Sequence, residues 1–137
     1  MARSVETYRG VAYPWLCDAM GHMNTQFYST LYDGAAFHFL AMIAPNAELA
    51  PRRLGWADVR QTTEYKQEVR GGTLLVITTQ LVRLGSSSLT YLHEMRNVET
   101  GELHSASELV TVLFNLDMRK ASPLDARARA RATALLS

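Results

Sequence analysis

The 137-residue sequence contains a single cysteine, Cys17, so an internal disulfide is excluded and a reducing compartment is expected. It contains no apolar run approaching the roughly 20 residues that a membrane helix needs, and its first ten residues lack the apolar centre of a secretory signal. These absences predict a cytoplasmic protein without membrane contact. The 14 basic and 13 acidic residues leave a net charge of +1, which argues against nucleic acid as a partner.

Recognisable metal and nucleotide motifs are also missing. The four histidines, at positions 22, 38, 93 and 104, have no close ligand spacing, and no metal site is expected. No glycine-rich phosphate loop is present. His38 lies in an expected buried helix, where packing or pocket lining would explain it. His93 and His104 lie in expected strands, where a position at the surface or in a dimer contact is the simplest interpretation.

The composition is that of one globular domain. Apolar residues make up 47% of the chain and charged residues 20%, which are ordinary values for a folded protein. We therefore expect one domain over residues 1–137, with a core at about 5–118 and a helical tail at about 122–137. The tail is rich in Ala and Arg, and a solvated helix explains it best.

The order of patterns along the chain predicts an α+β fold. Apolar residues at helical spacing predict one long helix over 24–43, with Asn24 as its N-cap. The 44–55 segment is expected to be irregular. Alternating and β-branched segments predict strands at 5–16, 57–69, 73–83, 89–98 and 102–116. Because short turns join the last four strands, we expect an antiparallel meander with the helix on one face.

The segment between the first strand and the helix concentrates reactive groups. Asp18, His22 and Asn24 precede a helix N-terminus, whose unpaired N–H groups suit a developing oxyanion. A carboxylate beside such donors can serve as a base or nucleophile towards an acyl carbon. Local roles remain open, since Asp18 or Asn24 can cap the helix and His22 can simply occupy a turn. Strand alternation puts Cys17 on the face opposite Asp18, which favours a packing role for the thiol.

This segment resembles a known family. The run D-A-M-G-H-M-N at 18–24, followed by a Tyr-rich helix, resembles the D-x-x-G-H-x-N signature of hotdog-fold acyl-CoA thioesterases, within the 4-hydroxybenzoyl-CoA thioesterase-like superfamily. The likeness continues through 64–74, 82–88 and the late run VTVLFNL, with Gly-Thr where the family commonly has Gly-Asp. It implies a hotdog fold, in which an antiparallel sheet wraps around one long central helix. It implies no cofactor, since coenzyme A belongs to the substrate.

The resemblance also assigns roles to residues. It makes Asp18 the catalytic carboxylate, places the oxyanion contact at the backbone N–H near Thr25, and has His22 and Asn24 shape the site. Asp58 and Glu64 are further acids to consider, although a solvated strand face accounts for Glu64. The side chains expected around the acyl group are aromatic: Trp15, Tyr28, Tyr32 and Trp56. Three further residues are expected to bind substrate at the end of the 73–83 strand and in the turn after it: Arg83, Ser86 and Ser87. Basic side chains at loop or strand ends could pair with the phosphates of coenzyme A, namely Arg52, Arg53, Arg83, Arg119 and Lys120.

Substrate and assembly follow from the same resemblance. It implies hydrolysis of a short or small acyl-CoA thioester, and the wording around residues 13–24 is similar to thioesterases of carnitine degradation that act on betainyl-CoA. A single sheet with open edges further predicts a homodimer or homotetramer. Two other activities stay open at this point, namely an acyl-CoA hydratase or dehydratase of the same fold and a non-catalytic acyl-CoA-binding protein.

Overall fold

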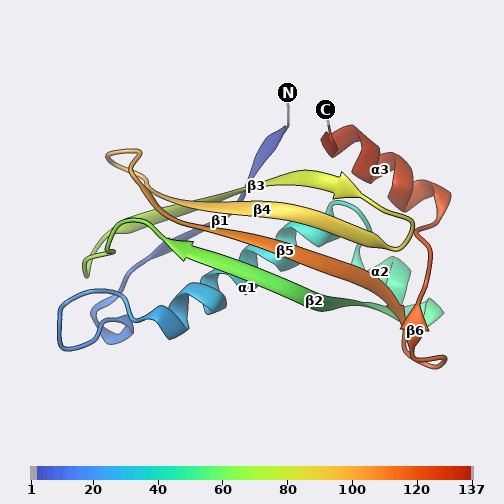
Figure 1. Ribbon diagram of the computed structural model, residues 1–137, viewed down its shortest axis with the longest axis horizontal. Coiled ribbons are helices and arrows are strands. Elements are labelled where there is room, and N and C mark those ends of the chain that lie inside the picture. The colour runs from blue at the N-terminus through green and yellow to red at the C-terminus, as the bar shows by residue number, and fades with distance from the viewer. Residues whose placement is uncertain (1–2, 137) are drawn as a thin grey trace.

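The computed structural model describes residues 3–136 (Figure 1). One strand, the helical elements, a run of strands and a last helix follow one another along the chain: β1 (Ser4–Val11), η1 (Pro14–Leu16), α1 (Thr25–Ala41), α2 (Asn46–Leu49), η2 (Ala50–Arg52), β2 (Leu54–Tyr65), β3 (Leu74–Leu84), β4 (Ser88–Asn97), β5 (Leu103–Asn115), β6 (Lys120–Ala121) and α3 (Ala126–Leu136). The first strand ends earlier than predicted because Pro14 starts a 3-10 turn. The segment at 44–55, expected to be irregular, contains α2 and η2.

The strands form one antiparallel sheet in the order β1-β3-β4-β5-β2, with the short β6 paired to β5. The predicted four-strand meander is therefore wrong, because β2 pairs with β5 and not with β3. The Gly71-Gly72 signal is a real turn, but it returns the chain beside β1, where Gly72 N–H bonds to the Ala12 carbonyl. The connection at 66–73 is long enough to cross from one edge of the sheet to the other. It leaves β1 and β2 as the two edges.

Helix α1 lies across one face of the sheet (Figure 1). Asn24 is its N-cap as predicted, with the side-chain oxygen accepting a hydrogen bond from the Gln26 N–H. The seven buried residues of α1 repeat at helical spacing: Tyr28, Leu31, Tyr32, Ala35, Ala36, Phe39 and Leu40. At 17 residues α1 is the main helix, and α2 and α3 accompany it. None of the helices at 3–136 is long and apolar enough to cross a membrane.

Beneath α1 the core divides into two apolar clusters with a row of polar side chains between them. The row crosses all five main strands. Thr79, His93, Ser107 and Thr63 are direct partners in the strand register, and Thr7 joins them from the register shift between Glu6 and Tyr8 of β1. Thr79 Oγ1 lies 2.8 Å from Thr7 Oγ1 and 2.7 Å from His93 Nδ1, and Thr63 Oγ1 lies 2.9 Å from Ser107 Oγ. Polar side chains are tolerated in the core here because most of them have hydrogen-bond partners.

Proton counting along this row defines the state of His93. The Thr7 hydroxyl donates to the Ile77 carbonyl, so its oxygen accepts the proton of Thr79. Thr79 has then used its only proton, and its oxygen accepts from His93 Nδ1–H. The imidazole is neutral, because burial lowers the pKa of His93 to about 4. His93 Nε2 is therefore a buried acceptor, and none of the side-chain or backbone groups at 3–136 donates to it.

The surface interpretation of two histidines was wrong. His93 is fully buried and His104 nearly so, with His104 Nδ1 lying 3.0 Å from the Gln67 carbonyl oxygen. His38, expected inside the helix packing, is exposed. The reason is what covers each side chain: His93 stacks on Tyr32 of α1, His104 meets Gln67 in the connection after β2, and His38 lies on the outer side of α1.

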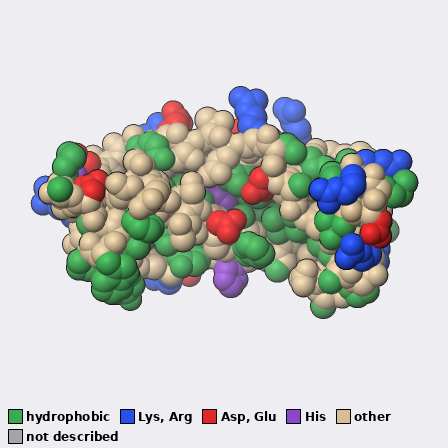
Figure 2. Space-filling view, turned by 90° about the horizontal axis from the view of Figure 1, so that it is seen from below, with side chains coloured by type: hydrophobic (Ala, Val, Ile, Leu, Met, Phe, Trp, Pro, Cys, Tyr) green, Lys and Arg blue, Asp and Glu red, His purple; other side chains and the backbone are tan. Residues whose placement is uncertain are grey.

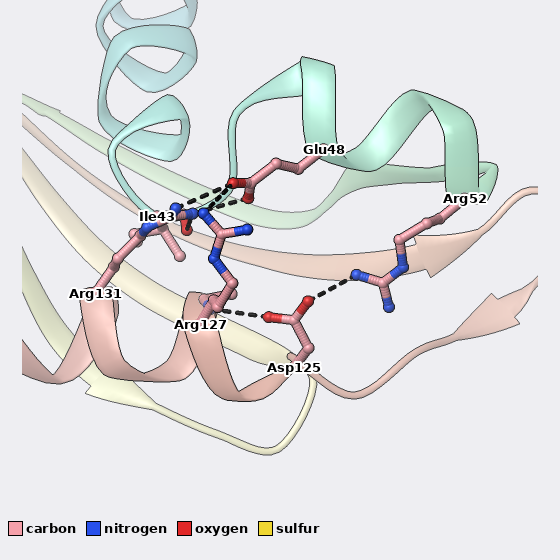
Figure 3. Close-up of polar contacts among 7 residues, drawn as sticks. Ile43, Glu48, Arg52, Asp125, Arg127 and Arg131 are labelled. Carbon is pink, nitrogen blue, oxygen red and sulfur yellow. Dashed lines mark hydrogen bonds and ion pairs between the residues drawn. The ribbon is translucent and has the colours of Figure 1, made fainter.

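The C-terminal helix α3 is docked onto the body and not merely solvated (Figure 3). Its inner side is buried at Ala128, Ala132 and Leu135. On its other side Arg131 binds both carboxylate oxygens of Glu48, at 2.8 and 3.0 Å, and Arg127 lies 3.1 Å from the same group. Asp125 caps the helix at Ala128 N–H and pairs with Arg52 at 2.8 Å. These contacts fasten α3 to α2 and η2.

Candidate active site

The loop before α1 is a small hairpin, and its pairing determines which side chains converge. Cys17 and Met23 form an antiparallel bridge, Asp18 N–H bonds to the His22 carbonyl, and Gly21 N–H closes the turn onto the Asp18 carbonyl. Gly21 has a φ of 79°, a left-handed conformation that favours glycine. Since Asp18 and His22 face each other across this ladder, their side chains project from the same side. Cys17 projects from the opposite side, as predicted.

The Asp18 carboxylate is exposed and is oriented by two donors. Oδ1 accepts from the Met20 N–H at 2.9 Å, and Oδ2 accepts from Asn24 Nδ2 at 3.4 Å. Asn24 cannot turn its amide around, because its oxygen is committed to capping Gln26. Asn24 therefore caps the helix with its oxygen and binds the Asp18 carboxylate with its nitrogen at the same time. The capping role and the role in shaping the site do not exclude each other.

Thr25 opens α1 next to this carboxylate. The first N–H groups of a helix have no intrahelical acceptor, and here Asn24 satisfies that of Gln26 with its side chain and that of Phe27 with its carbonyl. Within 3–136, the Thr25 N–H has no hydrogen-bond acceptor. An exposed donor at the positive end of the helix dipole can receive a carbonyl oxygen that gains negative charge.

His22 is held by an acid that the sequence patterns did not single out. Its Nε2 lies 3.1 Å from Oε2 of Glu68, in the connection between β2 and β3. Backbone bonds hold this connection against the hairpin, with Met23 N–H on the Val69 carbonyl and Gly71 N–H on that of Gly21. The acids considered from sequence, Asp58 and Glu64, lie elsewhere on β2. No local pattern identifies Glu68, since its contact depends on the path of the crossing connection.

The four aromatic residues expected around the acyl group are spread along the helix. Trp15 is 71% exposed, stacks on Tyr13 at 4.5 Å, and borders a pocket of about 610 Å³. Tyr28 and Tyr32 are buried in the core, and burial raises the pKa of both phenols. Trp56 lies at the start of β2, by the C-terminal half of α1. Only Trp15 and Tyr28 belong to the end of the molecule that carries Asp18.

The three other residues expected to bind substrate lie at the opposite end of β3 from the hairpin. Arg83 is near the last residue of β3, and Ser86 and Ser87 follow the strand, whereas the Gly72 turn before β3 adjoins the hairpin. An 11-residue strand spans about 35 Å. The Ser86 carbonyl instead accepts from Leu124 N–H and from the Arg129 guanidinium of α3. Within one chain the structure does not bring these three residues to Asp18.

A cleft runs between α1 and β2 on the face shown in Figure 2, where acidic side chains occupy the middle. It holds two pockets of about 270 and 330 Å³, which share Asp33 and Asp58. Among the described residues, no Lys or Arg lines either pocket, and the aromatic rings of Phe37 and Trp56 line the first pocket. Asp58 is fixed by the Thr111 hydroxyl at 2.8 Å. The cleft thus has a negative charge beside aromatic rings.

No group of three or more His, Cys, Asp and Glu side chains among the described residues could hold a metal ion. The chemistry available at the hairpin is instead that of a carboxylate, an imidazole with its own acid, and a free helix N–H. This set suits nucleophilic or general-base attack on an acyl carbon.

Comparisons with known proteins agree with this chemistry. Residues 12–132 match the model of the thioesterase-like superfamily, and the chain belongs to that superfamily. No curated protein matches the sequence.

Solved structures have the same fold. A Staphylococcus aureus protein solved in complex with CoA is 13% identical, with a TM-score of 0.89 over 98% of this chain and 86% of its own. A 1,4-dihydroxy-2-naphthoyl-CoA thioesterase from Synechocystis is 14% identical, with a TM-score of 0.82 over 96% and 97%. A DHNA-CoA thioesterase from Staphylococcus aureus is 18% identical, with a TM-score of 0.82 over 96% and 92%. The curled antiparallel sheet is thus that of hotdog-fold thioesterases.

Proposed function

We propose that this protein hydrolyses a small acyl-CoA thioester, with Asp18 as the catalytic carboxylate. The observation that carries the proposal is the placement of an oriented, exposed carboxylate beside the unpaired Thr25 N–H at the start of α1. Membership of the thioesterase-like superfamily supports it. The N–H polarises the thioester carbonyl, and the carboxylate supplies the base or the nucleophile.

In the general-base route Asp18 takes a proton from water as the hydroxyl adds to the carbonyl carbon. The C–S bond then breaks, and the leaving thiolate takes that proton from Asp18. The products are the free acid and the CoA thiol, and the carboxylate is restored. In the nucleophilic route an Asp18 oxygen attacks the carbonyl carbon, the C–S bond breaks, and coenzyme A leaves as the thiolate. Water then cleaves the mixed anhydride to the free acid and the Asp18 carboxylate, and the proton released ends on the thiolate. Asn24 serves both routes because it holds the carboxylate through Oδ2.

For the acyl group we propose betainyl-CoA. A quaternary ammonium is attracted to aromatic faces and to carboxylates, and the α1–β2 cleft offers both, with no lining Lys or Arg. Asp33 follows Thr25 by eight residues, or about 12 Å along the helix. A betainyl group is much shorter than this distance, so a thioester bound at Thr25 cannot reach Asp33 of the same chain. In this proposal the carboxylates that meet the ammonium group therefore come from the cleft of a second chain.

A homodimer, or a homotetramer built from it, is therefore part of the proposal. The β2 edge is unpaired beyond β5, and this edge borders the acidic cleft. Pairing two such edges would satisfy open backbone groups and bring the Asp18 end of one chain towards the cleft of the other. Two chains could likewise share coenzyme A between the hairpin of one and the residues at 83–87 of the other. A cytoplasmic location completes the proposal.

The test is a hydrolysis screen over CoA thioesters with wild-type protein and Asp18→Asn. We expect the variant to lose at least about 100-fold in kcat, since it keeps the shape and loses the base. Glu108→Gln, an exposed acid in the middle of β5, serves as the matched control and should keep full activity. Hydrolysis that persists in Asp18→Asn, or hydration of crotonyl-CoA in its place, would refute the proposal.

Substrate choice needs its own comparison. Betainyl-CoA and 3,3-dimethylbutyryl-CoA have the same shape and differ in the positive charge. We expect betainyl-CoA to have the higher kcat/KM. Equal use of the two, or preference for benzoyl- or butyryl-CoA, would remove the betainyl assignment and leave the thioesterase proposal standing.

A further inference from the structure

The contact between His22 and Glu68 has no role in the steps above. The two residues come from different loops, and the Glu68 side chain is 63% exposed while the His22 side chain is 24% exposed. A long exposed carboxylate ordinarily gains little from such a pair. Here, however, the backbone around both residues is fixed. Residues 22 and 70 form an antiparallel bridge, and Val69 between Glu68 and that bridge is fully buried.

The contact determines the tautomer of His22. A carboxylate oxygen has no proton to donate and repels a ring-nitrogen lone pair at 3.1 Å, so Nε2, the nitrogen beside Glu68 Oε2, is the protonated one. In the neutral ring, Nδ1 then keeps its lone pair. Nδ1 is bonded to the ring carbon nearest the backbone and so lies at the hairpin end of the ring. Because the Asp18 and His22 side chains project from the same side of the hairpin, the Nδ1 lone pair lies on the side of the hairpin that carries Asp18.

Building on the proposed hydrolysis, we propose that Glu68 is a positioning residue, which holds His22 so that Nδ1 and Asp18 together orient the attacking water. One water proton is directed at the Asp18 carboxylate and the other at Nδ1, which leaves an oxygen lone pair for the carbonyl carbon. The proton that breaks away goes to Asp18, while the proton at Nδ1 stays on the oxygen. In the nucleophilic route the same pair orients the water that cleaves the anhydride.

The Glu68 charge also acts on the first turns of α1. Burial, and after it Tyr65 and Glu68, raise the pKa of Tyr28 there. Glu68 is therefore close enough to the start of the helix to influence Tyr28, besides its 3.1 Å contact with His22. Glu64, four residues earlier, only approaches Lys66, at 3.6 Å, and provides a matched control.

The experiment measures kcat and KM for Glu68→Ala, Glu68→Gln and Glu64→Ala, each also in a His22→Asn background, on the best thioester of the screen. We expect Glu68→Ala to lower kcat about 10-fold, the size of a lost orientation, with KM nearly unchanged. Glu68→Gln should recover most of the rate, because its amide oxygen still accepts from Nε2–H. Glu64→Ala should have no effect. In His22→Asn, Glu68→Ala should cost nothing further.

Three results would overturn the proposal: an unchanged kcat in Glu68→Ala, an equal loss with and without His22, or no recovery by Gln. Thermal unfolding separates this positioning role from a purely structural one. Glu68→Gln should leave the unfolding temperature unchanged. The fall in kcat in Glu68→Ala should appear only when His22 is present. Failure of the hydrolysis proposal looks different, since the wild-type protein would then cleave no thioester or Asp18→Asn would remain active.

Discussion

Acid should weaken the fold through one buried imidazole. His93 is fully buried, and burial lowers its pKa to about 4. Protonation would put a proton on Nε2, for which the structure over residues 3–136 provides no acceptor. The unfolded chain carries an ordinary histidine that protonates near pH 6.5. Between these two pKa values the unfolded state binds more protons than the folded state, so stability falls as the pH falls.

The size of the effect follows from the two pKa values. Between pH 7 and pH 5 the His93 contribution costs about 2 kcal/mol of unfolding free energy, and about 3 kcal/mol by pH 4. Loss of this size is a large share of the stability of a small domain. Nearly all of the loss occurs below pH 6.5, and above pH 7 the group contributes no pH dependence.

The assay is urea unfolding from pH 7 to pH 4 for wild-type protein and His93→Asn. Asn keeps a donor for Thr79 but does not titrate, so other groups contribute equally to both curves. His93→Asn will be less stable at pH 7, since it leaves a cavity. Its stability should fall with acid by about 2 kcal/mol less than wild type down to pH 5. Parallel curves for the two proteins would refute the reasoning.

Two further predictions concern packing and the C-terminal helix. In Gly34→Ala the new Cβ would stand 2.8 Å from Tyr8, whose ring already meets Gly10 on its other edge. We expect the free energy of unfolding to fall by about 1 kcal/mol in the wild-type background and to rise by a similar amount in a Tyr8→Ala background. Urea unfolding that shows a rise in both backgrounds would contradict a clash with Tyr8. Glu48→Gln should speed amide exchange in α3 at low salt, because Arg131 and Arg127 lose their charged partner. The Arg131 hydrogen bond lowers the pKa of Glu48, so as that carboxyl protonates in acid the α3 amides of wild type should lose protection, measured relative to their intrinsic exchange rates at each pH. High salt should narrow the difference in protection between the two proteins. Protection that the substitution leaves unchanged would show that apolar contacts alone hold α3.

Sequence patterns alone brought the candidate residues together because these residues are close in the chain. Asp18, His22, Asn24 and Thr25 lie within eight positions, and the alternation of a short hairpin together with an N-cap signal is enough to put them at one helix start. The same local signals identified the main helix and the four long strands after it. Helical spacing and strand alternation depend on neighbours a few residues apart, so they can be read along the chain.

Tertiary structure decided everything that depends on distant segments. The pairing of β2 with β5, the burial of His93 and the approach of Glu68 to His22 all follow from the connection that crosses at 66–73. Turn residues at Gly71-Gly72 signal a change of direction but not which strand is met next. That choice reflects the total apolar area buried against α1, to which the whole sheet contributes. For this reason the motif is enough to propose Asp18 as the carboxylate, and only the fold shows that Glu68 lies beside His22.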